Sequence, residues 1–230
     1  MIPAPQPSSL AQDAAVGGFE LLYADDSLLV LNKPPGLLAV PGRGEYKQDC
    51  LSRRVQGRYP DALIVHRLDM ATSGLMLMAR GIRMQRALNR MFEGREVHKR
   101  YLAVVEGQPV QAPGPDGWSL IDLPIGLDWP RRPLRIIDPE HGKPSQTRWR
   151  TVACNMATNC ARVELEPVTG RSHQLRVHLH ALGHSILGDA LYAPAAAQPK
   201  AARLLLHASV LRFRHPDGGA AMHVESAPNF

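Results

Sequence analysis

The sequence predicts an α+β protein with a mixed, mostly antiparallel central sheet flanked by helices. Several short strand-like segments follow one another, only two or three segments have a helical period, and strands do not alternate regularly with helices. At 230 residues and 44% hydrophobic, the chain can bury one substantial core. We expect residues 1–18, rich in Pro, Ala, Ser and Gln, to be a flexible tail and residues 19–230 to form one domain.

The amino-terminal half predicts two pairs of strands and one helix. Two short strands surround Asp25-Asp26 and lead into the loop 33-KPPG-36. The apolar runs 62–65 and 75–79 flank a polar insert and predict a second pair. Residues 82–93 have apolar side chains at helical spacing, and the opposite face carries Arg83, Arg86 and Arg90, with Gly94 as the stop. A solvated helix face and a phosphate-binding face both fit these arginines.

The carboxyl-terminal half predicts further strands and a second helix. Residues 99–107 read as a buried strand and residues 107–118 as a loop rich in Pro and Gly. The period then changes to helical near Leu175, with Ser172 as the expected N-cap and Gly183 beyond the end. The remaining strand-like segments are 145–154 and 161–168, expected to pair as a hairpin, and 203–215.

Charge and cysteine content limit the classes of partner and compartment. Lys and Arg number 27 against 21 Asp and Glu, so a polyanion is a plausible partner. The 3 cysteines form no C-x-x-C motif, which argues against a disulfide framework or a zinc ribbon and favours a reducing compartment. No apolar run has the length of a membrane helix. We therefore expect a cytoplasmic protein with no membrane partner.

The sequence lacks the usual signals for cofactor chemistry. It contains no P-loop, no dinucleotide-binding glycine motif and no nucleophile elbow. His173, His178 and His180 lie in the predicted helix, but residues two and five apart on a helix diverge by about 200° and about 140°. Three imidazoles so arranged cannot converge on one ion. We expect neither a metal nor a cofactor.

The stretch 65-VHRLDMATSG-74 contains the strongest chemical signal. Arg67 and Asp69 lie two residues apart, so an extended backbone would direct both side chains to the same face. The pair fits a structural ion pair equally well as a functional one. A carboxylate held near a guanidinium is kept ionised, which is the form that a nucleophile or a base requires.

The motif 66-HRLDMATSG-74 resembles the signature of the RluA-type family of RNA pseudouridine synthases. The resemblance continues from about Leu21 to the carboxyl terminus, in 32-NKPPGLLAVPG-42, 99-KRYLAVV-105, 142-GKPSQT-147, 169-TGRSHQLRVHLHALGHSILGD-189 and 203-RLLLHA-208. It implies the pseudouridine synthase fold, with a catalytic cleft across the sheet. The implied reaction breaks the N1–C1′ bond of a flipped uridine and joins C5 to C1′, an isomerisation that needs no cofactor.

The resemblance also implies roles for individual residues. Asp69 matches the essential aspartate, Tyr101 the active-site tyrosine, and Arg176 the arginine that pairs with the aspartate. Without the resemblance, Tyr101 would be read as a core tyrosine and Lys33 as a loop lysine. The residues implied to contact RNA are Arg67, which would fill the space of the flipped uridine, and His66, Thr72, Lys33 and Arg171.

The expected substrate is structured RNA. The likeness is strongest to members that act on both 23S rRNA and the tRNA anticodon stem-loop. The first 18 residues are too few for the S4-type domain of many relatives, so we expect no S4 domain and substrate selection by the catalytic domain of a monomer. An rRNA-only enzyme and a non-catalytic RNA-binding protein with the same fold are the alternatives.

Overall fold

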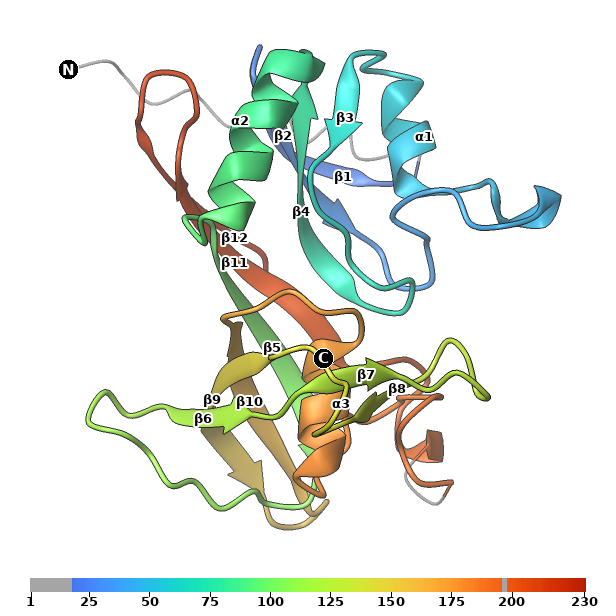
Figure 1. The fold of residues 1–230 in the computed structure, drawn as a ribbon, viewed down its shortest axis with the longest axis vertical. Helices are drawn as coiled ribbons and strands as arrows, with labels where there is room; N and C mark the ends of the chain where they lie inside the picture. The colour runs from blue at the N-terminus through green and yellow to red at the C-terminus, as the bar shows by residue number, and fades with distance from the viewer. Residues whose placement is uncertain (1–17, 196–197) are drawn as a thin grey trace. The chain divides into compact units, whose positions relative to one another are not determined.

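The computed structural model describes residues 18–195 and 198–230, so the tail expected for residues 1–18 lies outside the described residues except for Gly18. The chain divides into two compact units. The first takes in the described residues up to Val97 together with Leu211–Ser226, and the second takes in His98–Val210 together with Ala227–Phe230 (Figure 1).

The first unit contains an antiparallel sheet in which β2 (Leu28–Lys33) lies between β1 (Glu20–Ala24) and β4 (Ser73–Arg80). The turn between β1 and β2 is closed by Asp25, whose Oδ1 accepts hydrogen bonds from the backbone N–H groups of Ser27 and Leu28, both at 2.8 Å. On its other side β4 pairs with β3 (Ala62–Ile64). Both predicted strand pairs are confirmed.

Helices pack against the strands of the first unit. The helix predicted for residues 82–93 is α2 (Gly81–Glu93), which buries Met84, Leu88 and Met91 and ends at Gly94. Its three arginines, Arg83, Arg86 and Arg90, are exposed as predicted. The sequence did not predict three short elements of this unit, which are the 3-10 helix η1 (Glu45–Lys47), the helix α1 (Leu51–Gln56) and the strand β12 (Ala221–Glu225).

The second unit is built on a sheet in which the order of neighbours is β5-β10-β9-β6. The predicted hairpin is confirmed, because β9 and β10 pair antiparallel, and β10 also pairs antiparallel with β5. A separate two-stranded sheet, β7 and β8, packs with α3 around Ile125, Val177 and Tyr192 (Figure 1). The bounds are β5 (His98–Glu106), β6 (Ser119–Asp122), β7 (Ile125–Leu127), β8 (Arg135–Ile137), β9 (Gln146–Asn155), β10 (Cys160–Pro167), α3 (Gln174–Ala181) and η2 (Gln198–Lys200).

The last predicted strand is β11 (Leu206–Arg214), which begins in the second unit and ends in the first, where β12 pairs with it. The α+β class is confirmed, with antiparallel pairing throughout the strand pairs given above. No helix in the described part of the chain combines the length and the apolarity that crossing a bilayer requires.

The predicted N-cap of α3 is wrong. Ser172 does not cap the helix, because His173 occupies the N-cap position in a left-handed conformation with φ of 58°. The side chain of Gln174 organises the preceding loop instead, since its Oε1 accepts hydrogen bonds from the backbone N–H of Arg171 and the hydroxyl of Thr169. At the other end Gly183 has φ of 82° and closes the helix as predicted.

Candidate functional site

The first unit presents Asp69 on the loop between β3 and β4. Arg67 is exposed, Leu68 is buried and Asp69 is half-buried, the alternation expected of an extended backbone. After Asp69 the chain turns, and the N–H of Thr72 donates to the carbonyl of Asp69 at 3.1 Å. The N–H of Gly36 donates to the carbonyl of Met70 at 2.9 Å, so the loop is also tied to the 33-KPPG-36 turn.

Lys33 is buried and bonds the backbone of this loop. Its side chain is 0% exposed, and its Nζ donates hydrogen bonds to the carbonyls of Pro34, Leu37 and Met70 at 2.8, 2.9 and 3.1 Å. Burial lowers the pKa of Lys33 to about 8, and the charge of Asp69 acts in the opposite direction. The ammonium group of Lys33 thus bonds backbone carbonyls of its own turn and of the Asp69 loop. The expected contact of Lys33 with RNA stays a prediction.

The pKa of Lys33 predicts a pH-dependent stability. The folded-state pKa of about 8 lies below the ordinary value of 10.5, so between these values the unfolded chain binds more protons and the free energy of unfolding rises with pH. Lys33→Met removes this titration and leaves carbonyls without their donor, at a cost of about 1–3 kcal/mol. We expect urea unfolding to show a destabilisation that grows from pH 8 to pH 10; a constant difference would contradict the buried ammonium.

His66 and Thr72 anchor the two ends of the same loop. The Nε2 of His66 accepts a hydrogen bond from the backbone N–H of Leu77 in β4 at 2.8 Å, which places the proton of a neutral ring on Nδ1. The ring stacks on Phe92 of α2, with the ring centroids 4.7 Å apart. Thr72 is 2% exposed. His66 has structural contacts that the motif alone did not reveal. The expected contacts of His66 and Thr72 with RNA stay predictions.

The second unit carries Tyr101 on the buried face of its sheet. Tyr101 in β5 lies opposite Leu165 in β10, which in turn lies opposite Trp149 in β9, and all three are buried. Because successive residues of a strand alternate between faces, the neighbours of these residues point the other way. By burial and packing alone, Tyr101 resembles an ordinary core tyrosine.

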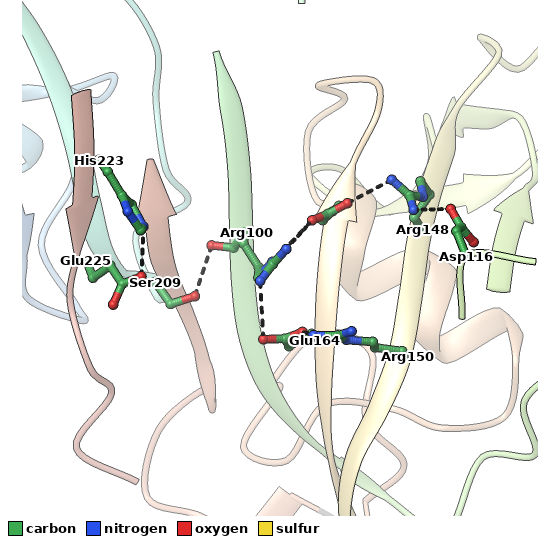
Figure 2. Close-up of polar contacts among 9 residues, drawn as sticks. Arg100, Asp116, Arg148, Arg150, Glu164, Ser209, His223 and Glu225 are labelled. Atoms are coloured by element: carbon green, nitrogen blue, oxygen red, sulfur yellow. Dashed lines mark hydrogen bonds and ion pairs between the residues drawn. The ribbon is translucent and has the colours of Figure 1, made fainter. Parts of the chain in front are cut away.

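The opposite face of these strands holds a network of ion pairs (Figure 2). Arg100 of β5 bonds Glu166 at 2.8 Å and lies 3.7 Å from Glu164, and both carboxylates also bond arginines of β9. Those are Arg150, which bonds Glu164, and Arg148, which bonds Glu166 and Asp116. The three guanidinium groups lie over the ring of Trp118, with their central carbons 4.7–5.4 Å from its centroid. The network fixes the register of the strand that carries Tyr101.

Arg176 of α3 is buried in the second unit and held by a carboxylate. Its Nε and one terminal nitrogen donate to the two carboxylate oxygens of Asp189 at 2.8 and 2.6 Å, and the two side chains are 5% and 1% exposed. The Asp189 carboxylate also accepts from the backbone N–H groups of Leu191 and Tyr192. Gly188, just before it, has φ of 71°, and a Cβ there would clash with the carbonyl of Arg203. Asp189 was missed in the sequence.

The remaining sequence-predicted residues have separate environments. Arg171 is exposed, and its guanidinium bonds the carbonyl of Pro144 at 3.4 Å. The three histidines of the α3 region bond different partners: His173 bonds Tyr192, His178 bonds Thr147 and the carbonyl of Leu123, and His180 bonds Ser185. Burial lowers the pKa of His178, in keeping with a neutral ring that donates from Nε2.

Solved structures of similar shape support the predicted fold. The chain superposes on the structure of human RNA pseudouridylate synthase domain containing 1 with a TM-score of 0.77 and 28% identity, covering 100% of this chain and 87% of that one. Human RNA pseudouridylate synthase domain containing 4 matches in fold with a TM-score of 0.68 and 24% identity over 91% of this chain and 88% of that one. These matches confirm the predicted pseudouridine synthase fold.

Sequence comparison gives the family. Residues 27–181 match the family model described as RNA pseudouridylate synthase. The chain is 50% identical over 210 residues to the dual-specificity RNA pseudouridine synthase RluA of Escherichia coli K12, covering 91% of this chain and 93% of that protein. The corresponding protein of Yersinia pestis is 46% identical over 91% of this chain and 99% of its own length. The chain belongs to the RNA pseudouridylate synthase family and is an enzyme that isomerises uridine in RNA.

Proposed function

We propose that the chain converts specific uridines of both 23S rRNA and tRNA anticodon stem-loops to pseudouridine, with Asp69, Tyr101 and Arg176 as the catalytic residues. The observation that carries this proposal is the braced Asp69 loop, in which three hydrogen bonds from one buried lysine fix the backbone around a half-buried carboxylate. A group so held is pre-organised for chemistry. The identity to dual-specificity relatives supports the substrate pair.

The proposed division of roles follows the chemistry of the isomerisation. The N1–C1′ bond must break, the uracil must rotate, and C5 must join C1′. C5 then loses its proton, and N1 ends the reaction with one, so the product is an isomer of the substrate. We propose Asp69 as the nucleophile or the base of this reaction. Arg67 is exposed next to it, so its cation can enter the stack where the target uridine leaves and offset part of the unstacking cost.

Phosphate contacts are proposed for the exposed arginines rather than for all basic residues. Arg100, Arg148 and Arg150 form ion pairs on the sheet of the second unit, so their charge is largely compensated by carboxylates. The exposed arginines of α2 and Arg171 are better candidates. Their contribution should fall as salt increases. A monomeric state and a cytoplasmic location stay predictions.

Tritium release from [5-³H]uridine tests the proposed substrate range. Wild-type protein is expected to release tritium from both an rRNA fragment and a tRNA, because the C5 hydrogen leaves in every turnover. Release from the rRNA fragment alone would favour the rRNA-only alternative. Release from neither RNA, with gel-shift binding retained, would favour a non-catalytic RNA-binding role.

A further inference from the structure

An exposed aromatic side chain marks a second feature of interest in the second unit. Trp129 is 66% exposed, whereas the other two of the 3 tryptophans, Trp118 and Trp149, are buried. It lies in the loop of residues 128–134 that joins β7 to β8 and projects from the unit (Figure 1). Tryptophan is enriched at binding interfaces, where one part of its ring system is apolar and another is in water.

The loop around Trp129 is closed by its own hydrogen bonds. The N–H of Asp128 donates to the carbonyl of Leu134 at 3.1 Å, and the N–H of Leu134 donates to the carbonyl of Arg131 at 3.0 Å. The Asp128 carboxylate accepts from the backbone N–H and the Nε of Arg131 at 3.2 and 2.7 Å. The tryptophan is therefore presented on a fixed scaffold, which lowers the entropy lost on binding.

Arg132 orients the ring and adds positive charge beside it. Its Nε donates to the carbonyl of Trp129 at 3.1 Å, and its guanidinium carbon lies 4.9 Å from the ring centroid. Arg132 thus lies over one face of the ring. The side chain of Arg131, two residues after Trp129, is 72% exposed and bonds the Asp128 carboxylate at 2.7 Å. A flat ring with one arginine over it and a second exposed arginine in the same short loop matches the chemistry of a nucleotide.

The base of the hairpin is joined to the helix that carries Arg176. Ile125 of β7 packs in one cluster with Val177 of α3 and with Tyr192. The hydroxyl of Tyr192 accepts a hydrogen bond from the backbone N–H of Arg135 at 2.9 Å, and the guanidinium of Arg176 lies over the Tyr192 ring at 5.1 Å. A base bound at Trp129 would thus have a defined position relative to Arg176.

We propose that Trp129 is a stacking platform for an unpaired base of the RNA substrate, with Arg131 and Arg132 contacting the phosphates that flank it. This inference rests on the proposed function, because it assumes that the substrate is structured RNA with an unpaired loop. It adds a recognition point outside the residues assigned to catalysis. Stacking tolerates any base, so the platform selects unpaired structure more than sequence.

The direct test is intrinsic fluorescence during RNA titration. A tRNA anticodon stem-loop is expected to quench the emission of wild-type protein and to protect it from acrylamide, because Trp129 is the exposed tryptophan. In Trp129→Phe the RNA-dependent change should vanish while binding, followed by gel shift, stays within about threefold of wild type. Quenching of equal size in Trp129→Phe would overturn the proposal, because the signal would then come from a buried tryptophan.

A second arm measures the energetic effect of the ring. Trp129→Ala should raise the Kd and the KM for the stem-loop about tenfold, in the range measured for base–aromatic stacking, with little change in rate at saturation. Val110→Ala, a change at another exposed apolar residue of the same unit, is the matched control and should bind as wild type. Affinity for a fully paired duplex should be the same in wild type and Trp129→Ala.

The outcomes separate this inference from the proposed function. Wild-type affinity of Trp129→Ala for the stem-loop would refute the platform even if tritium release is normal. Failure of wild-type protein to release tritium would refute the proposed substrates, yet the fluorescence and gel-shift arms need no turnover. An equal loss of affinity for stem-loop and duplex would also count against the platform, because a paired base has no free face to stack.

Discussion

Asp69→Asn is expected to reduce the single-turnover rate of tritium release by about 10⁴-fold, the upper end of what one acid or base group contributes. Asparagine has nearly the same shape as aspartate, so the loop should keep its hydrogen bonds to Lys33 and Gly36, which involve backbone carbonyls and N–H groups. It lacks the negative charge and the proton-accepting oxygen. Loss of a carboxylate should not weaken binding to a polyanion, so RNA affinity should be equal to or greater than that of wild type.

Asp26→Asn is a suitable control because Asp26 lies in the same unit on an exposed turn. It should release tritium at the wild-type rate. A second signature comes from Lys33, whose pKa is raised by the charge of Asp69 against the larger effect of burial. In Asp69→Asn the pKa of Lys33 should therefore fall further, which starts the rise in stability at a lower pH. Activity within tenfold of wild type in Asp69→Asn would show that another group does the chemistry.

The elements predicted correctly from sequence are those with a long pattern or an unambiguous turn. The run of apolar residues in β4, the helical stripe of α2 and the paired strands β9 and β10 each extend over at least eight residues. The hydrophobic period predicts the secondary structure of such segments well, because many side chains follow the same period. Short elements such as α1, with six residues, carry too few pattern positions, and their structure depends on tertiary packing.

The site was predictable only where one motif holds the chemistry. Asp69 and Arg67 lie together in a single loop, so the sequence could nominate both. Lys33 reads as a loop lysine beside two prolines, yet one of its acceptors, the carbonyl of Met70, is 37 residues away in the chain. Its burial is a property of the fold, and no local pattern reports it. Trp129 is the converse case, a tryptophan whose exposure only the folded hairpin shows.

Asp189 is another residue whose burial and partner the local sequence does not reveal. It follows an apolar segment and a glycine, 13 residues after Arg176, and nothing in that spacing suggests an ion pair. Only the fold brings the two together and buries both side chains. A carboxylate in such a position accepts four hydrogen bonds, two from Arg176 and two from backbone N–H groups.

Asp189→Asn should destabilise the protein by about 3 kcal/mol, measured by urea unfolding at pH 7. Removing one partner of a buried ion pair costs about 3–5 kcal/mol, because the remaining charge loses its compensation in a medium of low polarity. The amide of asparagine retains one accepting oxygen, but its NH₂ group faces guanidinium N–H groups and cannot accept from them. The lower end of the range is therefore expected.

The control is Glu106→Gln, which breaks the exposed pair between Glu106 and Lys200 in the same unit. Ion pairs in water contribute little, so this variant should unfold almost as wild type does. Equal stability of Asp189→Asn and wild type would show that the ion pair between Asp189 and Arg176 does not stabilise the fold.

If Arg176 is catalytic, Asp189→Asn should also lower the rate of tritium release at saturating RNA, at a temperature where the variant is folded. A purely structural Asp189 would leave that rate unchanged, and Asp189→Glu, which keeps the charge, should recover part of it only if the carboxylate orients Arg176 for the reaction.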